Sequence, residues 1–200
     1  MKRIFTLTLA MLFVCIFSST AVFAASESAH KIGNGVYSFT IGEGNHSMFV
    51  VGDTSVAVFE TFNSRHSQKL LEAVRQITDK PIKYAFISHN HWDHASGGQV
   101  FSKAGTKTVM HKLAAEWVKA NPGRDATAPD MTWTGDRMDI DMGNFTVQMR
   151  YLGLNHCLGL TIFTIPERRV AYIADFGYAE PGYVCGGSRF QYWRVGTQSW

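Results

Sequence analysis

The chain has 200 residues, of which 46% are hydrophobic and 18% are charged. This length allows one domain with a single core, and the composition excludes a disordered or fibrous protein. The formal net charge of +3 at pH 7 is too small to favour nucleic acid or an anionic membrane as a partner.

Residues 1–24 carry the three features of a secretory signal peptide. Lys2 and Arg3 give a positive start, an apolar run follows from Ile4 to Phe17, and small residues lead to Ala24. The run is shorter than the ~20 apolar residues of a spanning helix, so we expect cleavage after Ala24 and no stable membrane anchor. Cleavage removes two of the 19 basic residues and none of the 16 acidic ones, which leaves 17 against 16. We therefore expect an exported protein, periplasmic or secreted.

Strand-type and helix-type patterns alternate along the rest of the chain. A helix is expected over Ser64–Thr78, because Leu70, Leu71, Val74 and Ile77 share one apolar stripe and Asn63 or Ser64 can cap its start. A strand over Ile82–Ser88 follows it. The other expected elements are strands over Val36–Ile41, Met48–Val51, Ser55–Phe59, Thr108–Met110, Phe145–Leu152, Leu160–Ile165 and Val170–Ala174, a helix over Leu113–Ala120 and a loop over 121–137. This order predicts an α/β layered protein.

A dense group of metal-binding residue types follows the Ile82–Ser88 strand. The segment His89-Asn90-His91-Trp92-Asp93-His94 places three imidazoles and one carboxylate within six residues. Nitrogen and oxygen ligands of this kind suit zinc. In an extended exit from the strand, His89 and His91 point the same way and can reach one ion. A turn after them lets Asp93 and His94 reach a second position nearby.

This segment resembles the metallo-β-lactamase superfamily, whose hallmark is His-x-His-x-Asp-His. The resemblance covers roughly residues 33–185 and implies an αβ/βα sandwich with metals at one edge, between two sheets. Leu154-Asn155-His156-Cys157-Leu158-Gly159 matches the place of the family's third histidine, and Ala174-Asp175-Phe176 matches that of a bridging aspartate. The resemblance implies that His89, His91 and His156 hold a first metal, that Asp93 and His94 hold a second, and that Asp175 lies between them.

The chemistry expected of such a site is hydrolysis of a small molecule. One or two zinc ions would lower the pKa of bound water and provide a hydroxide that attacks an ester, thioester, lactone or amide. Asp93 is the expected catalytic residue, because it can orient the hydroxide or pass its proton to the leaving group. Iron and manganese are alternatives to zinc.

The sequence departs from the family pattern in two places. The family has one more histidine ligand beyond the bridging aspartate, whereas no histidine follows His156 here. We therefore expect a metallo-β-lactamase domain over 33–187 that is incomplete at its C-terminal end, with an apolar sheet face left uncovered, and an atypical tail over 188–200 outside the fold. Glu60 stands where the family usually has aspartate, which puts its support of the site in doubt.

Three readings of function follow. The first is the zinc hydrolase described above, the second is a β-lactamase, and the third is an inactive metal-binding fragment or an iron-dependent oxidoreductase relative. Cys157 and Cys185 form a disulfide in one interpretation, and Cys157 is a free thiol near metal in the other. The upstream histidines are interpreted as surface or core residues: His30, His46, His66 and His111.

Overall fold

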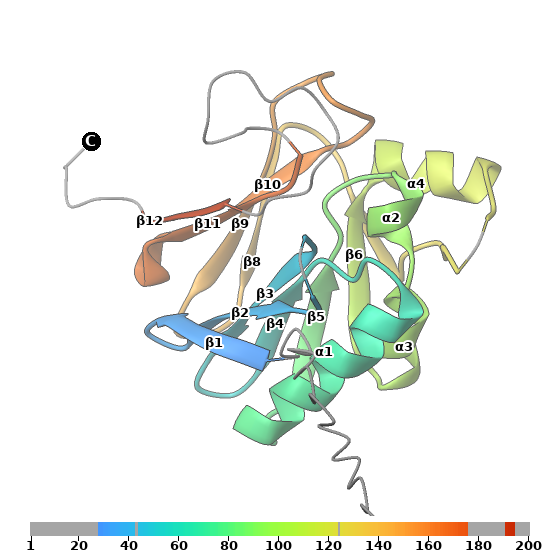
Figure 1. The fold of residues 1–200 in the computed structure, drawn as a ribbon. Helices are drawn as coiled ribbons and strands as arrows, with labels where there is room; N and C mark the ends of the chain where they lie inside the picture. The colour runs from blue at the N-terminus through green and yellow to red at the C-terminus, as the bar shows by residue number, and fades with distance from the viewer. Residues whose placement is uncertain (1–27, 43, 124, 176–190, 195–200) are drawn as a thin grey trace, which may run out of the picture.

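The computed structural model describes residues 28–42, 44–123, 125–175 and 191–194 (Figure 1). The expected signal peptide and Cys185 lie outside these residues, so cleavage and disulfide pairing stay predictions. No helix in the described part of the chain is long and apolar enough to cross a bilayer.

Two sheets make up most of the molecule (Figure 1). The first has seven strands in chain order, antiparallel from β1 to β4 and parallel from β4 to β7. Its strands are β1 (Ser28–Gly33), β2 (Val36–Thr40), β3 (His46–Val51), β4 (Val56–Phe59), β5 (Ile82–Phe86), β6 (Lys107–His111) and β7 (Met131–Trp133). The second is antiparallel, in the order β12-β11-β10-β9-β8. Its strands are β8 (Arg137–Asp141), β9 (Thr146–Tyr151), β10 (Thr161–Ile165), β11 (Val170–Ile173) and β12 (Gln191–Arg194).

The helices of the described chain lie on the outer side of the first sheet (Figure 1). They are α1 (Ser64–Ile77), α2 (Trp92–Ala95), α3 (Gly98–Lys103) and α4 (Lys112–Ala120), and a 3-10 turn (Pro166–Arg168) joins β10 to β11. Leu70 and Val74 of α1 are fully buried in a cluster with Phe101 of α3, as the expected stripe requires. Asn63 caps α1 by accepting a hydrogen bond from the backbone N–H of His66 at 2.9 Å.

Aromatic side chains fill the space between the two sheets. Phe59 and Phe86 come from the first sheet, Phe163 and Tyr172 from the second, and all four are buried. The ring centroids of Phe59 and Phe163 lie 5.4 Å apart, at an edge-to-face angle of 62°. This packing fixes the two sheets relative to each other, and so fixes the loops that leave their ends.

The α/β sandwich predicted from the sequence is confirmed, with local differences. β1 begins at Ser28, before the predicted start at residue 33, and β7 lies inside the segment predicted as a loop. Three residues give β7 too little pattern to be recognised. Part of the tail expected to lie outside the fold forms β12, which pairs antiparallel with β11. An edge strand pairs through its backbone, so a missing side-chain period does not prevent it. Residues 188–190 and 195–200 lie outside the described chain.

Strands β8, β9 and β10 carry polar side chains on the outward face of the second sheet. Inward-facing Val147 and Met149 are fully buried. Between them Gln148 accepts a hydrogen bond from Thr164 at 3.1 Å, and Arg150 pairs with Asp139 at 2.6 Å. Alternation along β9 therefore gives one face to the core and one to solvent.

Candidate metal centre

The histidine-rich segment begins where parallel strands of the first sheet end. β4, β5 and β6 finish side by side, and the backbone N–H of Glu60 donates to Phe86 O at 2.8 Å. The N–H of Ile87 donates to Val109 O at 2.9 Å. The carboxyl ends of parallel strands are the usual place for ligands in such sheets. His89 leaves this edge fully buried.

The loop after β4 holds the turn that carries His94. Thr61 Oγ1 donates to Ser96 O at 2.7 Å, and the N–H of His94 donates to His91 O at 2.9 Å. Gly97 has φ 81°, and a Cβ there would lie 2.5 Å from the backbone of Asn63. Only glycine can make this close approach, which brings α2 against the loop.

The second sheet contributes the loop that carries His156. Asn90 lies between two of the motif histidines, and its Oδ1 accepts from the N–H of Leu158 at 3.1 Å. The N–H of Thr161 donates to Ser88 O at 2.9 Å. Gly159 has φ 68° and a Cβ there would lie 2.9 Å from Ala114 N, so the loop sits directly on α4. The motif and the later loop are thus joined by direct hydrogen bonds.

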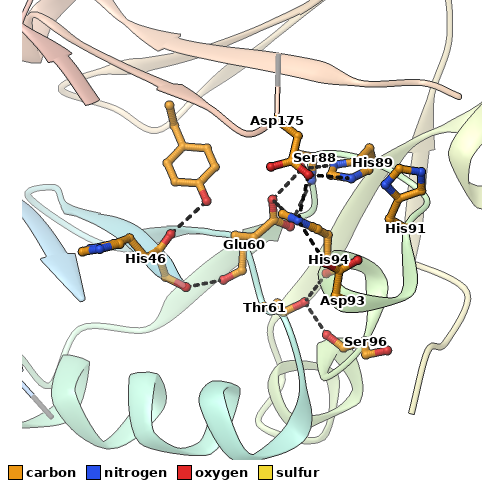
Figure 2. A network of polar contacts seen from close by, with 12 residues as sticks. His46, Glu60, Thr61, Ser88, His89, His91, Asp93, His94, Ser96 and Asp175 are labelled. Carbon is orange, nitrogen blue, oxygen red and sulfur yellow. Dashed lines mark hydrogen bonds and ion pairs between the residues drawn. The ribbon is translucent and has the colours of Figure 1, made fainter. Parts of the chain in front are cut away.

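The motif residues His89, His91 and His94 converge with Asp175 (Figure 2), and His156 joins them from a separate segment. His156 Nε2 lies 3.2 Å from His91 Nδ1 and 3.4 Å from Asp175 Oδ2. Asp175 Oδ2 also lies 3.3 Å from His94 Nε2 and 3.7 Å from His89 Nε2. One carboxylate oxygen is therefore surrounded by imidazole nitrogens.

These separations fit ligands of a shared ion. Two atoms that each lie 2.0–2.1 Å from a tetrahedral zinc are about 3.3 Å apart. Charge-assisted hydrogen bonds are shorter, at about 2.7–2.9 Å. His89 Nε2 is buried and has no hydrogen-bond partner, although an orphaned buried nitrogen is costly. The residues present therefore fit a divalent metal.

Two of the first-site histidines, His89 and His91, are held in the neutral form that metals bind. Burial lowers the pKa of His89 well below 6.5, and the charges of neighbouring histidines lower it further. Burial and His156 lower the pKa of His91. Because a ligating imidazole must be unprotonated, both are ready to bind at neutral pH.

Glu60 supports the site, contrary to the doubt raised by its length. Its buried carboxylate accepts a hydrogen bond from Ser88 Oγ and lies 3.2 Å from His94 Nδ1. Ser88 Oγ also lies 2.8 Å from His89 Nδ1. One side chain thus orients two imidazoles, as partners of metal ligands commonly do. The register of β4 beside β5, which places Glu60 next to Ser88, is the signal that could have identified this role.

Charge in the metal-free site is shared among Glu60, Asp175 and His94. Burial acts to lower the pKa of His94, but Glu60 and Asp175 outweigh it and raise that pKa to about 10. Burial acts to raise the pKa of Asp175, but its hydrogen bond to His94 and the nearby histidines lower it. One imidazolium therefore faces two carboxylates, a charge balance that a metal cation can also supply.

The backbone is strained at this site. Glu60, Phe62 and Asp175 are non-glycine residues with φ of 74°, 56° and 52°. Each such position costs on the order of 1–3 kcal/mol and persists where surrounding contacts enforce it. Two of the three carry the carboxylates of the network, so strain is concentrated on residues of the candidate centre.

Asp93 differs from the other predicted ligands. Its side chain is 79% exposed, and its Oδ2 lies 3.8 Å from His94 Nε2. It lines a cleft of about 680 Å³ beside the histidines. The other lining residues are Asn45, Phe62, Asn63, His91, Trp92, Ser96, Trp117 and Asp125. Asp93 thus lies between the cleft and the histidines, and its roles as ligand and catalyst stay predictions.

Cys157, His66 and His111 are buried, whereas His46 is half-buried and His30 is exposed. Burial raises the pKa of the Cys157 thiol to about 12. His111 is buried between the rings of Trp133 and Tyr151, at centroid distances of 4.5 and 4.6 Å. His66 is buried as well, and its Nε2 lies 2.8 Å from Ser47 Oγ.

Residues 41–195 match the family model of the metallo-beta-lactamase superfamily. The chain belongs to this superfamily. Among solved structures, a metallo-beta-lactamase from Pontibacter korlensis aligns with a TM-score of 0.63 at 18% identity, covering 72% of this chain and 69% of that one. The Rm3 metallo-beta-lactamase aligns with a TM-score of 0.62 at 14% identity, covering 84% of this chain and 61% of that one. These likenesses show the shared fold.

Two curated relatives are similar in sequence. The 2,4-dinitroanisole O-demethylase subunit alpha of Nocardioides sp. (strain JS1661) is 27% identical over 68% of this chain and 42% of its own length. The metallo-beta-lactamase IND-1 of Chryseobacterium indologenes is 25% identical over 62% of this chain and 51% of its own length. The matched part of this superfamily member thus spans 42% of the length of the first relative and 51% of the length of the second.

Proposed function

We propose that this chain is a zinc-dependent hydrolase of a small ester, thioester, lactone or amide. His89, His91 and His156 would hold one ion and Asp93 and His94 a second, with Asp175 shared between them. The observation that carries the proposal is Asp175 Oδ2, which lies 3.3–3.7 Å from three imidazole nitrogens. We further propose, from residues 1–24 alone, that the protein acts after export.

Bound zinc supplies a Lewis acid and lowers the pKa of water to near 7. The chain supplies the rest. Glu60 and Ser88 hold the His89 and His94 rings in place. The cleft beside His91 binds the substrate, and the partly exposed ring of Trp92 lines it. Asp93 lines the same cleft, and its proposed role is to carry a proton to the leaving group.

The direct test is metal-dependent turnover by purified protein. We expect hydrolysis of a chromogenic ester by zinc-loaded protein, loss after chelation and recovery when zinc is returned. Asp93→Asn should lower kcat by about 10²- to 10⁴-fold, because proton transfer in the transition state contributes that much. The ion at the first site should be retained, because His89, His91 and His156 hold it without Asp93. Zinc-loaded protein that turns over no ester, thioester, lactone or amide reporter would contradict the proposal.

The names of the relatives suggest two other reactions, β-lactam hydrolysis and O-demethylation. A chromogenic β-lactam tests for the hydrolysis, and release of 2,4-dinitrophenol from 2,4-dinitroanisole tests for the demethylation. Each is assayed with the same zinc-loaded and iron-loaded protein. Turnover of the ester without turnover of these two supports the hydrolase proposed above, whereas iron-dependent demethylation alone would replace it.

A further inference from the structure

A thiol belongs to the same cluster as the three first-site histidines. One ligand atom from each of His89, His91, His156 and Cys157 lies within 4.8 Å of the others. Cys157 is 8% exposed, so its sulfur lies inside the protein rather than at the mouth of the cleft. The residue expected to bridge the two ions is Asp175, and the metal centre proposed above gives the Cys157 sulfur no role.

A hydrogen bond holds the loop of the thiol against the motif. The Asn90 side chain, between His89 and His91, accepts from the N–H of Leu158 at 3.1 Å. The residue that follows Cys157 is therefore bonded directly to the motif.

An independent observation indicates that something binds here. His89 is fully buried, and its Nε2 has no hydrogen-bond partner. A buried polar atom of this kind requires an explanation such as a bound ion. A ring nitrogen of His89 and the Cys157 sulfur lie within 4.8 Å of each other, close enough to share one ion.

We propose that the Cys157 sulfur is a fourth protein ligand of the ion held by His89, His91 and His156. On binding, the S–H bond breaks, the sulfur lone pair bonds to the cation and the proton leaves to solvent. In a tetrahedral site sulfur and nitrogen ligands are about 3.5 Å apart. The cluster, which spans up to 4.8 Å, therefore contracts around the ion.

This inference rests on the metal centre proposed above and changes how it works. Catalytic zinc sites keep one position open, whereas four protein ligands close the site. The ion held by three histidines and Cys157 is then structural. Cys157 then takes the position that Asp175 was proposed to share, so Asp175 belongs to the second ion alone, together with His94. That second ion is the one that acts on substrate.

The test uses wild-type protein loaded with Co²⁺, whose absorption reports its ligands. We expect visible d–d bands together with a near-ultraviolet sulfur-to-cobalt charge-transfer band. Cys185→Ser, the matched control, should keep both. Cys157→Ser should keep the visible bands, lose the charge-transfer band and bind zinc about 100-fold more weakly.

Several results would overturn the assignment. Visible bands without a charge-transfer band in the wild type would remove Cys157 from the ligand set and leave the histidine site intact. Loss of the band in Cys185→Ser instead would move the ligand to that residue. A Cys157–Cys185 disulfide that persists in the metal-loaded protein, seen by mass spectrometry, would exclude a thiolate ligand. No cobalt binding at all would overturn the metal centre itself.

Discussion

Glu60 lies between two sets of imidazoles, a first group around Asp175 and a second group around His66. The groups differ in whether their ring nitrogens have hydrogen-bond partners. In the first, His89, His91, His94 and His156 face Asp175, and His89 Nε2 has no hydrogen-bond partner. In the second, His66 Nε2 lies 2.8 Å from Ser47 Oγ. Ser47 donates its one hydroxyl hydrogen to Glu60 O, so it accepts from His66. The rings of Phe39 and Phe62 pack against His66.

The hydrogen bonding of the ring nitrogens distinguishes a binding site from a packed core, whereas the number of histidines does not. Both groups contain buried imidazoles whose pKa is lowered by burial. Only the first leaves a buried nitrogen without a partner and surrounds a carboxylate with imidazoles. Unsatisfied atoms that converge indicate a missing ion, whereas satisfied ones indicate structure.

The largest expected effect comes from removing two imidazoles of the first group. His89→Ala combined with His91→Ala should reduce zinc affinity on the order of 10⁴-fold. A four-ligand site contributes ~10–16 kcal/mol, so each ligand contributes about 3 kcal/mol. Elemental analysis measures the metal content of the double variant, and competition with a chelator measures its zinc affinity.

The matched control is His66→Gln in the second group. It should leave metal content unchanged, because His66 bonds to Ser47 and its ring packs against phenylalanines. Unchanged metal content in the double variant would contradict the metal centre. Equal losses in both proteins would erase the distinction between the two groups.

Glu60 connects the groups, so its removal should affect both. Its carbonyl accepts from Ser47, and its carboxylate contacts Ser88 and His94. Glu60→Ala should lower the free energy of unfolding of metal-free protein by about 3–5 kcal/mol, because it leaves His94 buried without its charge partner. Urea denaturation measures it. Glu60→Asp, which keeps the charge, should lose less, and equal losses would show that the carboxylate has no specific role.

The second group should make folding stability depend on pH. Burial, with a smaller contribution from the charge of His46, lowers the pKa of His66 to about 4 from the ordinary 6.5. The unfolded chain therefore takes up this proton first. Stability is complete above pH 6.5 and falls as the pH drops toward 4.

The expected loss from His66 between pH 7.5 and 5 is about 2 kcal/mol. It is measured by urea denaturation of metal-free wild type and His66→Gln over this range. The variant should be less sensitive to acid by this amount. Identical pH profiles would show that His66 is accessible to protons in the folded protein.

Sequence patterns located the motif but not the contacts that support it. His89, His91 and His94 follow one strand, so spacing alone places them together. Helix α1 and its Asn63 cap were equally local features. Glu60, Ser88 and Asn90 act across strands and loops, and their partners are fixed by sheet register and loop docking. The short elements β7, α2 and β12 gave too few residues for a recognisable period.

The smallest expected effect concerns the N-cap of α1. It tests whether the two groups of histidines respond independently. Asn63 belongs to the loop after Glu60 and also lines the cleft, yet its Oδ1 serves the backbone N–H of His66. Asn63→Ala should cost about 1 kcal/mol, the usual loss for a cap, and lower Tm by about 2–4 °C. Asn63→Ser keeps an acceptor and should recover most of this in a thermal unfolding experiment. Zinc affinity should stay within about twofold in both variants, because the cap holds the second group and none of the metal-facing nitrogens. A large fall in affinity would mean that the two groups respond as one unit.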